Sequence, residues 1–516
     1  SHNILLITRF DGIEKRALKI KNFKFSIMRF FRKILPVLLL LSSGFTFAQA
    51  PPEPYGALPS ARQLAWHQVD VYGLVHFTPT TFENKEWGYG DADPKIFNPA
   101  QFDADKIVAA FKAGGLKGLV LVAKHHDGFA LWPTKTSPYN ISQSPFRDGK
   151  GDMVKEFEQA CRKAGLKFGV YCSPWDRNNP AYGTHEYVKT YRKQLTELYT
   201  NYGELFMSWH DGANGGDGYY GGERATRKID RSTYYGWDTT WAITRKLQPW
   251  ANLFSDIGWD VRWVGNESGF AGETSWATFT PVPAKGMNEA IPGNLNHEVN
   301  PFGTRGGKNW VPAECDVPLR PGWFHHPEQK GKTKTPEQLF SLYLKSVGRG
   351  AALDLGIAPD TRGLLDDEDV KSLEGFGRLV AESFKINLAQ AATLRVTNKR
   401  SKSYKGMFVL DGILDSYWAT EDTVKNAAIN LTWTSEQTFD LIRMKEHIPL
   451  GQRIDSVEVD AMINGNWAKI ASATSVGACR IIQLNEPVKT TQLRFRIAAP
   501  VCITMSELGV YKKASL

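Results

Sequence analysis

The sequence has 516 residues, a length that predicts two or three domains, and its composition is ordinary for a globular protein apart from 16 tryptophans. The formal net charge is +9, but residues 1–50 contain nine Lys/Arg and two Asp/Glu, which leaves 54 basic and 52 acidic residues in the remainder. The basic character therefore belongs to the N-terminal segment and gives no argument for a nucleic-acid partner.

Residues 28–50 have the pattern of a secretory signal peptide. The basic stretch Met28–Lys33 precedes the apolar stretch Ile34–Leu41, and Ala48–Ala50 has the small residues of a cleavage site. The apolar stretch is too short to span a bilayer. We therefore expect a leader over residues 1–50 and export across the inner membrane, to the bacterial periplasm or the extracellular space, with no membrane insertion of the mature chain.

From about residue 60 to 385, continuous apolar strands alternate with helices that stop at glycines. The expected strands are 72–77, 118–123, 167–171, 205–209, 252–255 and 351–357, and the expected helices are 103–113, 153–164, 186–202, 233–247 and 366–384. Continuously apolar strands are typical of a parallel sheet. More than four such strand–helix units favour a (β/α)₈-like TIM barrel, an α/β fold, which we assign to residues 51–388.

The pattern changes after about residue 390, where short strands alternate apolar and polar residues and turn signals recur every ten or so residues. The expected strands include 429–434, 455–463, 467–471 and 492–497, and Asn464-Gly465 predicts a hairpin turn. These features indicate a C-terminal all-β sandwich over residues 389–516. The sequence does not indicate an oligomeric state.

Polar and aromatic residues stand where the expected barrel strands end. They are His76, the segment 124–127 (Lys-His-His-Asp), Tyr171 and Asp211. Catalytic residues of TIM barrels lie at the carboxyl ends of the strands, so these positions predict one active site at that face of the barrel.

Two carboxylates in aromatic surroundings suggest glycosidic bond chemistry. Asp211 follows a short apolar strand and is the candidate nucleophile, although an Asp-Gly pair is also common in plain turns. Glu267 is the candidate acid/base, 56 residues further on. Glu273, Glu314 and Asp316 compete with it for that role, and sequence spacing alone does not choose between them.

Neither a metal nor another cofactor is expected. The five cysteines are odd in number, widely spaced and without a Cys-x-x-Cys pair, which argues against a disulfide framework or a zinc site. His125 and His126 are adjacent, and neighbouring residues of a strand point to opposite faces, so they should not bind one ion together. Hydrogen bonding to sugar hydroxyls or structural anchoring explains them better.

Eight short segments carry a resemblance to a known family. They are 73–77 (Gly-Leu-Val-His-Phe), 86–87 (Glu-Trp), 124–129 (Lys-His-His-Asp-Gly-Phe), 169–171 (Gly-Val-Tyr), 209–212 (Trp-His-Asp-Gly), 262–267 (Arg-Trp-Val-Gly-Asn-Glu), 320–324 (Arg-Pro-Gly-Trp-Phe) and 346–350 (Ser-Val-Gly-Arg-Gly). In these segments the chain resembles the α-L-fucosidases of glycoside hydrolase family 29, and segment 262–267 resembles the branch that prefers α-1,3/1,4 linkages.

The resemblance implies a retaining exo-hydrolase that releases terminal α-linked L-fucose from oligosaccharides or glycoconjugates, with Asp211 as nucleophile and Glu267 as acid/base. The substrate-binding residues that it implies are His76, Glu86, Trp87, His125, His126, Tyr171, Trp209, Arg262 and Trp323. His210 stands where the family usually has Phe, and we expect its side chain to point away from Asp211.

Two other functions fit the same features. A secreted glycan-binding protein whose barrel has lost catalysis would keep the tryptophan-rich pocket and need no proton donor. A barrel glycosidase with another sugar specificity would keep both carboxylates. The C-terminal domain resembles discoidin-type sandwiches around residues 410–420, where it either binds sugar or supports the barrel.

Overall fold

The computed structural model describes residues 50–213, 215–256, 259–291 and 295–516. The predicted signal peptide lies outside these residues except for Ala50. The chain divides into the units 1–50 and 51–516, and the second unit contains both the barrel and the C-terminal β domain. Within the described residues, no helix has both the length and the apolar character needed to cross a bilayer.

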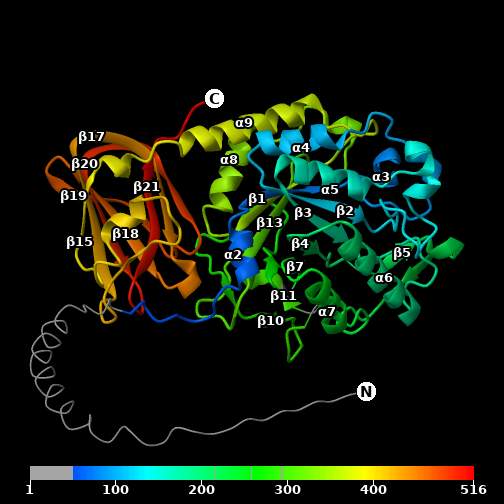
Figure 1. Ribbon diagram of the computed structural model, residues 1–516, viewed down its shortest axis with the longest axis horizontal. Helices are drawn as coiled ribbons and strands as arrows, with labels where there is room; N and C mark the ends of the chain where they lie inside the picture. The colour runs from blue at the N-terminus through cyan, green and yellow to red at the C-terminus, as the bar shows by residue number, and fades with distance from the viewer. Residues whose placement is uncertain (1–49, 214, 257–258, 292–294) are drawn as a thin grey trace, which may run out of the picture. The chain divides into compact units, whose positions relative to one another are not determined.

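Eight parallel strands close into the barrel that the sequence predicts (Figure 1). In spatial order they are β1 (Val71–Val75), β14 (Ala352–Ile357), β13 (Ala313–Pro318), β8 (Val261–Trp263), β7 (Asn252–Ser255), β4 (Met207–Trp209), β3 (Lys167–Cys172) and β2 (Gly118–Lys124). The strands β8 and β13 were not expected from the sequence, and they complete the ring between β7 and β14.

Eight α-helices occur in the described part of the barrel domain. They are α2 (Ala61–His67), α3 (Pro79–Phe82), α4 (Ala104–Ala113), α5 (Met153–Ala164), α6 (His185–Asn201), α7 (Trp237–Leu247), α8 (Pro336–Lys345) and α9 (Asp367–Ser383). Figure 1 shows α4 beside both α5 and α9, as their contacts require. The carboxylates of Asp103 and Asp152 accept the backbone N–H groups of Lys106 and Lys155 in the first turns of α4 and α5, and such caps favour the start of a helix at these positions.

The connections between barrel strands carry three short antiparallel pairs. They are β5 (Gly216–Gly218) with β6 (Ala225–Arg227), β9 (Thr278–Phe279) with β12 (Asn309–Trp310), and β10 (Val282–Pro283) with β11 (Leu295–Asn296). The pairs β9–β12 and β10–β11 both belong to the long connection from β8 to β13. That connection begins with the segment that bears Glu267.

The C-terminal residues form an antiparallel β domain with its own apolar core. Its strands are β15 (Thr393–Val396), β16 (Trp418–Ala419), β17 (Asn426–Glu446), β18 (Ser456–Ile463), β19 (Asn466–Ala473), β20 (Arg480–Ala498) and β21 (Thr504–Tyr511). Asn464 and Gly465 join β18 to β19 with φ angles of 51° and 80°, the left-handed conformation that an Asn-Gly hairpin turn requires. All five cysteines are buried and free.

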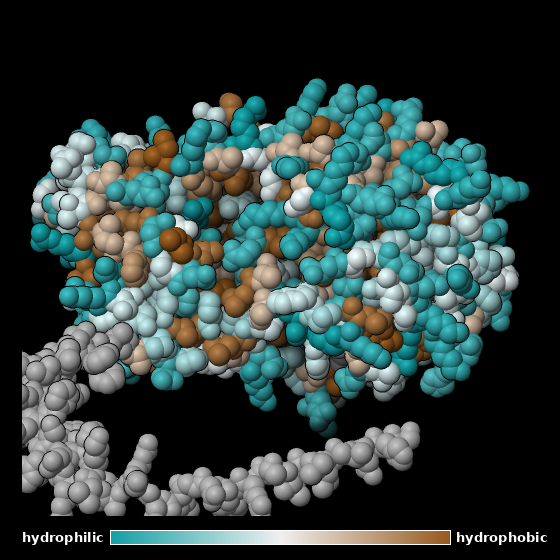
Figure 2. Space-filling model, in the orientation of Figure 1, coloured by the Kyte–Doolittle hydropathy of each residue, from teal (hydrophilic) through white to brown (hydrophobic). Residues whose placement is uncertain are grey.

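Hydrogen bonds join the barrel to the β domain. The backbone N–H of Ile481 donates to the carbonyl of Gly348 at 2.8 Å, and the guanidinium of Arg480 donates to the carbonyl of Glu273. On the face drawn in Figure 2, hydrophilic side chains cover most of the barrel helices and apolar side chains occur in scattered groups.

The outer face of β1 leaves no space beside Gly73. A Cβ atom at this position would lie 2.5 Å from Cε1 of the buried Phe111 on α4. We expect Gly73→Ala to lower the free energy of unfolding by about 1–3 kcal/mol, because overpacking forces side chains and backbone apart. Urea unfolding measures this change. Adding Phe111→Leu should restore part of the loss, and a Gly73→Ala variant as stable as the parent would contradict the packing described.

Candidate active site

The carboxyl ends of the barrel strands surround one cavity of about 300 Å³. Its lining contains eight of the residues singled out from the sequence: His76, Trp87, His125, His126, Tyr171, Trp209, Trp323 and the candidate nucleophile Asp211. Glu267, the candidate acid/base, lines the same cavity. Barrel closure therefore brings the two candidate catalytic carboxylates, which come from separate strand ends, to one pocket.

The carboxylate of Asp211 is fixed by two hydrogen bonds just beyond the end of β4. Oδ1 accepts the backbone N–H of Ala213 at 2.6 Å, and Oδ2 accepts the hydroxyl of Tyr171 at 2.9 Å. Burial raises the pKa of Asp211, and these two donors oppose that rise because they stabilise the ionised form. Because one oxygen is bound to the backbone and the other to a phenol, the carboxylate of Asp211 is held in one orientation relative to the cavity.

Glu267 lies on a more open part of the cavity lining. Its side chain is exposed, and Oε2 accepts the indole N–H of Trp323 at 3.2 Å. Among its competitors, Glu273 is exposed and lies near Arg480, and Glu314 is fully buried beneath the cavity. Neither of them lines the cavity, whereas Asp316 does.

Three histidines form a neutral cluster on one wall. The rings of His125 and His126 lie 4.1 Å apart between centroids, and His76 lies 5.4 Å from His125. Burial lowers the pKa of His76 and of His126 to about 3, and the pKa of His125 also falls. These rings therefore stay uncharged at neutral pH and offer hydrogen bonds without carrying charge.

His125 and His126 do not face opposite sides, so that prediction was wrong. Strand β2 ends at Lys124, so the alternation of a strand does not extend to these two residues, and both rings line the cavity. No group of three or more potential metal ligands occurs among the residues that the structure describes. His210 points away from the cavity as expected, because its ring nitrogens contact Tyr191 at 2.8 Å and Ser208 at 3.1 Å.

The structure does not place Arg262 in the lining of the cavity, contrary to the expectation from the sequence. Its side chain is fully buried, and its guanidinium donates to the backbone carbonyls of Trp276, Asn300 and Val311. All three acceptors belong to the connection between β8 and β13, so the donors of the guanidinium are bound there. Arg262 therefore organises the segments behind the cavity lining.

Glu86 is likewise absent from the cavity lining, and it holds the segment that carries Trp323. Its carboxylate accepts the backbone N–H groups of Trp323 and, at 3.1 Å, of Phe324, and contacts the ring of His326 at 3.2 Å. An expected sugar contact is thus a support for the loop. The side chain of Trp323 projects from this loop toward the ring of His76, with 5.3 Å between ring centroids.

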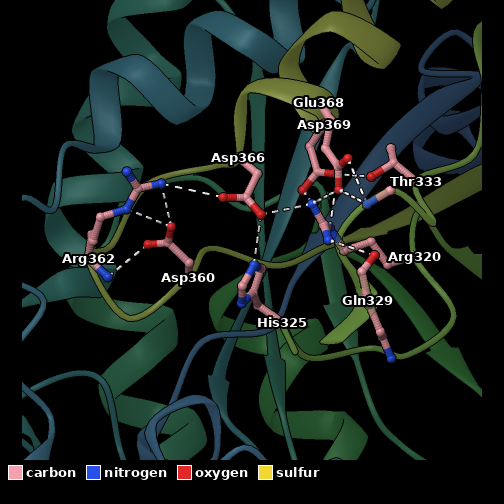
Figure 3. Close-up of polar contacts among 10 residues, drawn as sticks. Arg320, His325, Gln329, Thr333, Asp360, Arg362, Asp366, Glu368 and Asp369 are labelled. Carbon is pink, nitrogen blue, oxygen red and sulfur yellow. Dashed lines mark hydrogen bonds and ion pairs between the residues drawn. The ribbon is translucent and has the colours of Figure 1, made fainter. Parts of the chain in front are cut away.

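The other side of this loop is anchored at the start of α9 (Figure 3). The buried guanidinium of Arg320 bridges Asp366 at 2.9 Å, Glu368 at 2.6 Å and Asp369 at 2.9 Å, and His325 contacts Asp366 at 2.9 Å. An acidic cluster at a helix N-terminus is stabilised by the helix dipole as well as by the guanidinium. The loop with Trp323 is therefore held from both ends.

Several residues of the cavity were missed by the sequence analysis. They are Leu74, Gly212, Ala213, Arg231, Phe254, Asp256, Trp263 and His297. Phe254 lies near the end of β7, where the strand-end rule that located His76 also applies, whereas Trp263 ends β8, a strand that was not expected from the sequence. Arg231 lies in a turn and His297 begins a short 3-10 helix (His297–Val299), so neither stands at the end of a barrel strand.

Three buried carboxyl groups lie at the barrel interior beneath the cavity. Asp354 stands beside Asp316 in the β13–β14 register, and Glu314 precedes Asp316 by two residues on β13. Burial raises the pKa of Glu314 to about 7 and raises the pKa of Asp316 and of Asp354 well above the usual range of aspartate, with the neighbouring carboxylates adding to each aspartate's rise. All three groups therefore hold a proton to higher pH than an exposed carboxyl group does.

The sequence profile described as Alpha-L-fucosidase matches residues 57–383. Alpha-L-fucosidase 1 of Arabidopsis thaliana is 36% identical over 497 residues, covering 95% of this chain and 94% of the relative. A putative alpha-L-fucosidase of Bacteroides thetaiotaomicron has a crystal structure with a TM-score of 0.81 and 34% identity, covering 90% of this chain and 99% of that one. A family 29 fucosidase of Ruminococcus gnavus, solved in complex with fucose, gives 0.80 and 27%, covering 91% and 98%.

The buried Asp354 makes folding stability depend on pH. The folded state holds the proton of this carboxyl more tightly than the unfolded chain, so stability falls as pH rises above the unfolded pKa of about 3.9, by at most about 1.4 kcal/mol per pH unit. We expect Asp354→Asn, which carries no titrating proton, to gain stability relative to the parent between pH 5 and pH 8. Urea unfolding at the two pH values measures this gain, and an equal difference at both would contradict it.

Proposed function

The chain belongs to the α-L-fucosidase family and is a glycoside hydrolase, and from this premise we propose that it is a retaining exo-enzyme that removes terminal α-linked L-fucose by double displacement. One observation carries this proposal: Asp211 and Glu267 line a single cavity walled by aromatic and neutral histidine side chains. Such walls suit a deoxy-sugar, because its C–H faces pack on rings while its hydroxyls bond to imidazole nitrogens.

In the first step, Oδ2 or Oδ1 of Asp211 attacks the anomeric carbon, and the bond from that carbon to the glycosidic oxygen breaks. The proton of the Glu267 carboxyl passes to the departing oxygen. In the second step, Glu267 takes a proton from water, whose oxygen displaces the Asp211 carboxylate and releases fucose. Tyr171 and the N–H of Ala213 hold the nucleophile between the two steps.

The neighbouring aromatic groups give this pocket its shape. Tyr171 stacks on Trp209 with 5.0 Å between ring centroids, and Trp209 stacks on Phe254 at 4.1 Å. Trp87 is 51% exposed and contacts the ring of His126 at 5.1 Å, so its outer face is free to cover an apolar part of the sugar. A large exposed indole at a pocket mouth is a typical sugar contact rather than a core residue.

The basic and apolar pattern of residues 28–50 supports export of the mature chain, which we propose acts in the periplasm or outside the cell on fucosylated glycans. The alternative of an inactive glycan-binding barrel has no comparable support, since the oriented carboxylate of Asp211 is a feature that binding alone does not need. Release of the phenol from an aryl α-L-fucoside separates the two.

We expect Asp211→Ala to lower kcat by roughly 10³-fold or more, because the covalent intermediate cannot form. Azide should partly restore turnover by entering the space of the missing carboxylate, and the product should be the β-fucosyl azide. Glu267→Ala with azide should give the α-fucosyl azide, since the nucleophile remains. Chromatography and NMR of the products read the configuration.

Glu273→Ala is the matched control for these two variants. Glu273 was a competitor for the acid/base role, yet its side chain is exposed and does not line the cavity. Its activity should stay near that of the parent. A fall in Glu273→Ala as large as that in Glu267→Ala, or full activity in Asp211→Ala, would refute the assignment.

We further propose a preference for α-1,3/1,4-linked fucose on branched Lewis-type glycans, on the basis of segment 262–267. The cavity lining extends beyond the histidine wall to polar side chains of Arg231, Asp256 and His297, which are suited to contact a second sugar. Digestion of Lewis-type trisaccharides should therefore be at least about tenfold faster in kcat/KM than digestion of 2'-fucosyllactose, a difference of about 1.4 kcal/mol. Equal rates would contradict this specificity.

A further inference from the structure

Strand β13 contacts both sides of the cavity through two carboxyl groups. Oε1 of Glu314 accepts the indole N–H of Trp209 at 2.7 Å, and Oδ1 of Asp316 accepts the indole N–H of Trp263 at 2.9 Å. The two acceptors are two residues apart, so their side chains leave the strand on the same face, the barrel interior. Both donors line the cavity.

Each of these tryptophans lies close in sequence to one of the two catalytic carboxylates. Trp209 is the last residue of β4 and stands two residues before Asp211. Trp263 is the last residue of β8 and stands four residues before Glu267. The strand β4 is not a neighbour of β13, because β7 and β8 lie between them, so the bond from Trp209 to Glu314 crosses the barrel interior.

We propose that Glu314 and Asp316 are positioning residues, which tie the strand ends bearing the nucleophile and the acid/base to one rigid strand through Trp209 and Trp263. This inference rests on the assignment of Asp211 and Glu267 above. Glu314 acts on the nucleophile side, and Asp316 acts on the acid/base side. Neither role is that of a proton donor to the substrate.

The surroundings of Glu314 show that its position is well defined. The side chain is fully buried, and its second oxygen, Oε2, accepts the hydroxyl of Tyr72, which in turn accepts the indole N–H of Trp66 at 3.3 Å. Both carboxyl oxygens are therefore engaged. Because the Glu314 side chain is 0% exposed and bound through both oxygens, its hydrogen bond fixes the indole of Trp209 relative to β13.

Asp316 is placed differently, at the boundary between the barrel interior and the cavity. Its residue is 4% exposed, it lines the cavity, and the backbone of Trp263 is held in turn by the amide of Asn300, which donates to the Trp263 carbonyl at 2.9 Å. Burial and the nearby carboxylates raise the pKa of Asp316, and the oxygen that accepts from Trp263 occupies the place that the amide oxygen of an asparagine would take. This similarity makes the amide variant a faithful replacement.

Two substrates distinguish the effect of Glu314 on the nucleophile from the effect of Asp316 on the acid/base. A nitrophenyl α-L-fucoside has a leaving group that departs with little protonation, whereas a fucosylated disaccharide needs the acid. We expect Asp316→Leu, which removes the acceptor at similar volume, to lower kcat/KM on the disaccharide by roughly 10–100-fold, because the acid/base is misplaced. The nitrophenyl fucoside should lose less than about threefold in kcat/KM, because its leaving group depends little on protonation by Glu267.

Glu314→Met should instead affect both substrates to a similar extent. It removes the acceptor for Trp209 and should lower kcat/KM on both substrates by a similar factor of roughly 10-fold, because attack by the nucleophile is common to both. The amide variants Asp316→Asn and Glu314→Gln keep an oxygen acceptor and should return most of the activity. Glu273→Ala is the matched control: its side chain is exposed and does not line the cavity, and this variant should leave the ratio between the two substrates unchanged.

The outcomes are distinct. If Asp316→Leu fails to fold, Trp263→Phe removes the same hydrogen bond from the other end and should show the same dependence on the substrate. Equal losses on both substrates in Asp316→Leu and Trp263→Phe, or an Asp316→Asn variant as impaired as Asp316→Leu, would overturn the positioning role. A parent enzyme that releases neither product would instead overturn the proposed function.

Discussion

Closure of the barrel is the constraint on which the site depends. Strand β1 pairs with both β14 and β2, so segments from residue 71 to residue 357 share one ring of hydrogen-bonded backbone. In a closed parallel sheet the carboxyl ends of all strands lie at one rim, and residues remote in sequence meet there. Without that closure, Asp211 and Glu267 would belong to separate loops and the chain would have two carboxylates but no site.

Most of the ring could be predicted because its strands are apolar on both faces. Residues 118–124 are buried throughout, and the strand was recognisable as a continuous apolar run. Strands β8 and β13 were missed for a physical reason. Their sequences, Val-Arg-Trp and Ala-Glu-Cys-Asp-Val-Pro, contain the buried charged residues Arg262, Glu314 and Asp316, each of which finds hydrogen-bond partners. A hydropathy pattern assigns such residues to the surface.

In the candidate site, the local sequence located some residues, whereas the roles of others depend on their packing in the folded chain. Residues at clear strand ends, such as His76 and Tyr171, could be located, and they line the cavity. Whether a charged group near the site faces the substrate or the scaffold could not be predicted. Arg262 and Glu86 use their charges on backbone groups behind the lining, and only the three-dimensional partners distinguish that arrangement from a sugar contact.

The buried carboxyl groups of Glu314 and Asp316 are needed because tryptophans form part of the pocket walls. An indole N–H at the top of a barrel must find an acceptor, because a buried unpaired donor costs about 1–3 kcal/mol. Backbone carbonyls of the closed sheet already serve the neighbouring strands, so the acceptor has to be a side chain that reaches across the interior. Glu314 and Asp316 meet this need at the expense of burying two neighbouring carboxyl groups. The aromatic shape of the sugar pocket and the acidic interior beneath it are therefore two consequences of one packing solution.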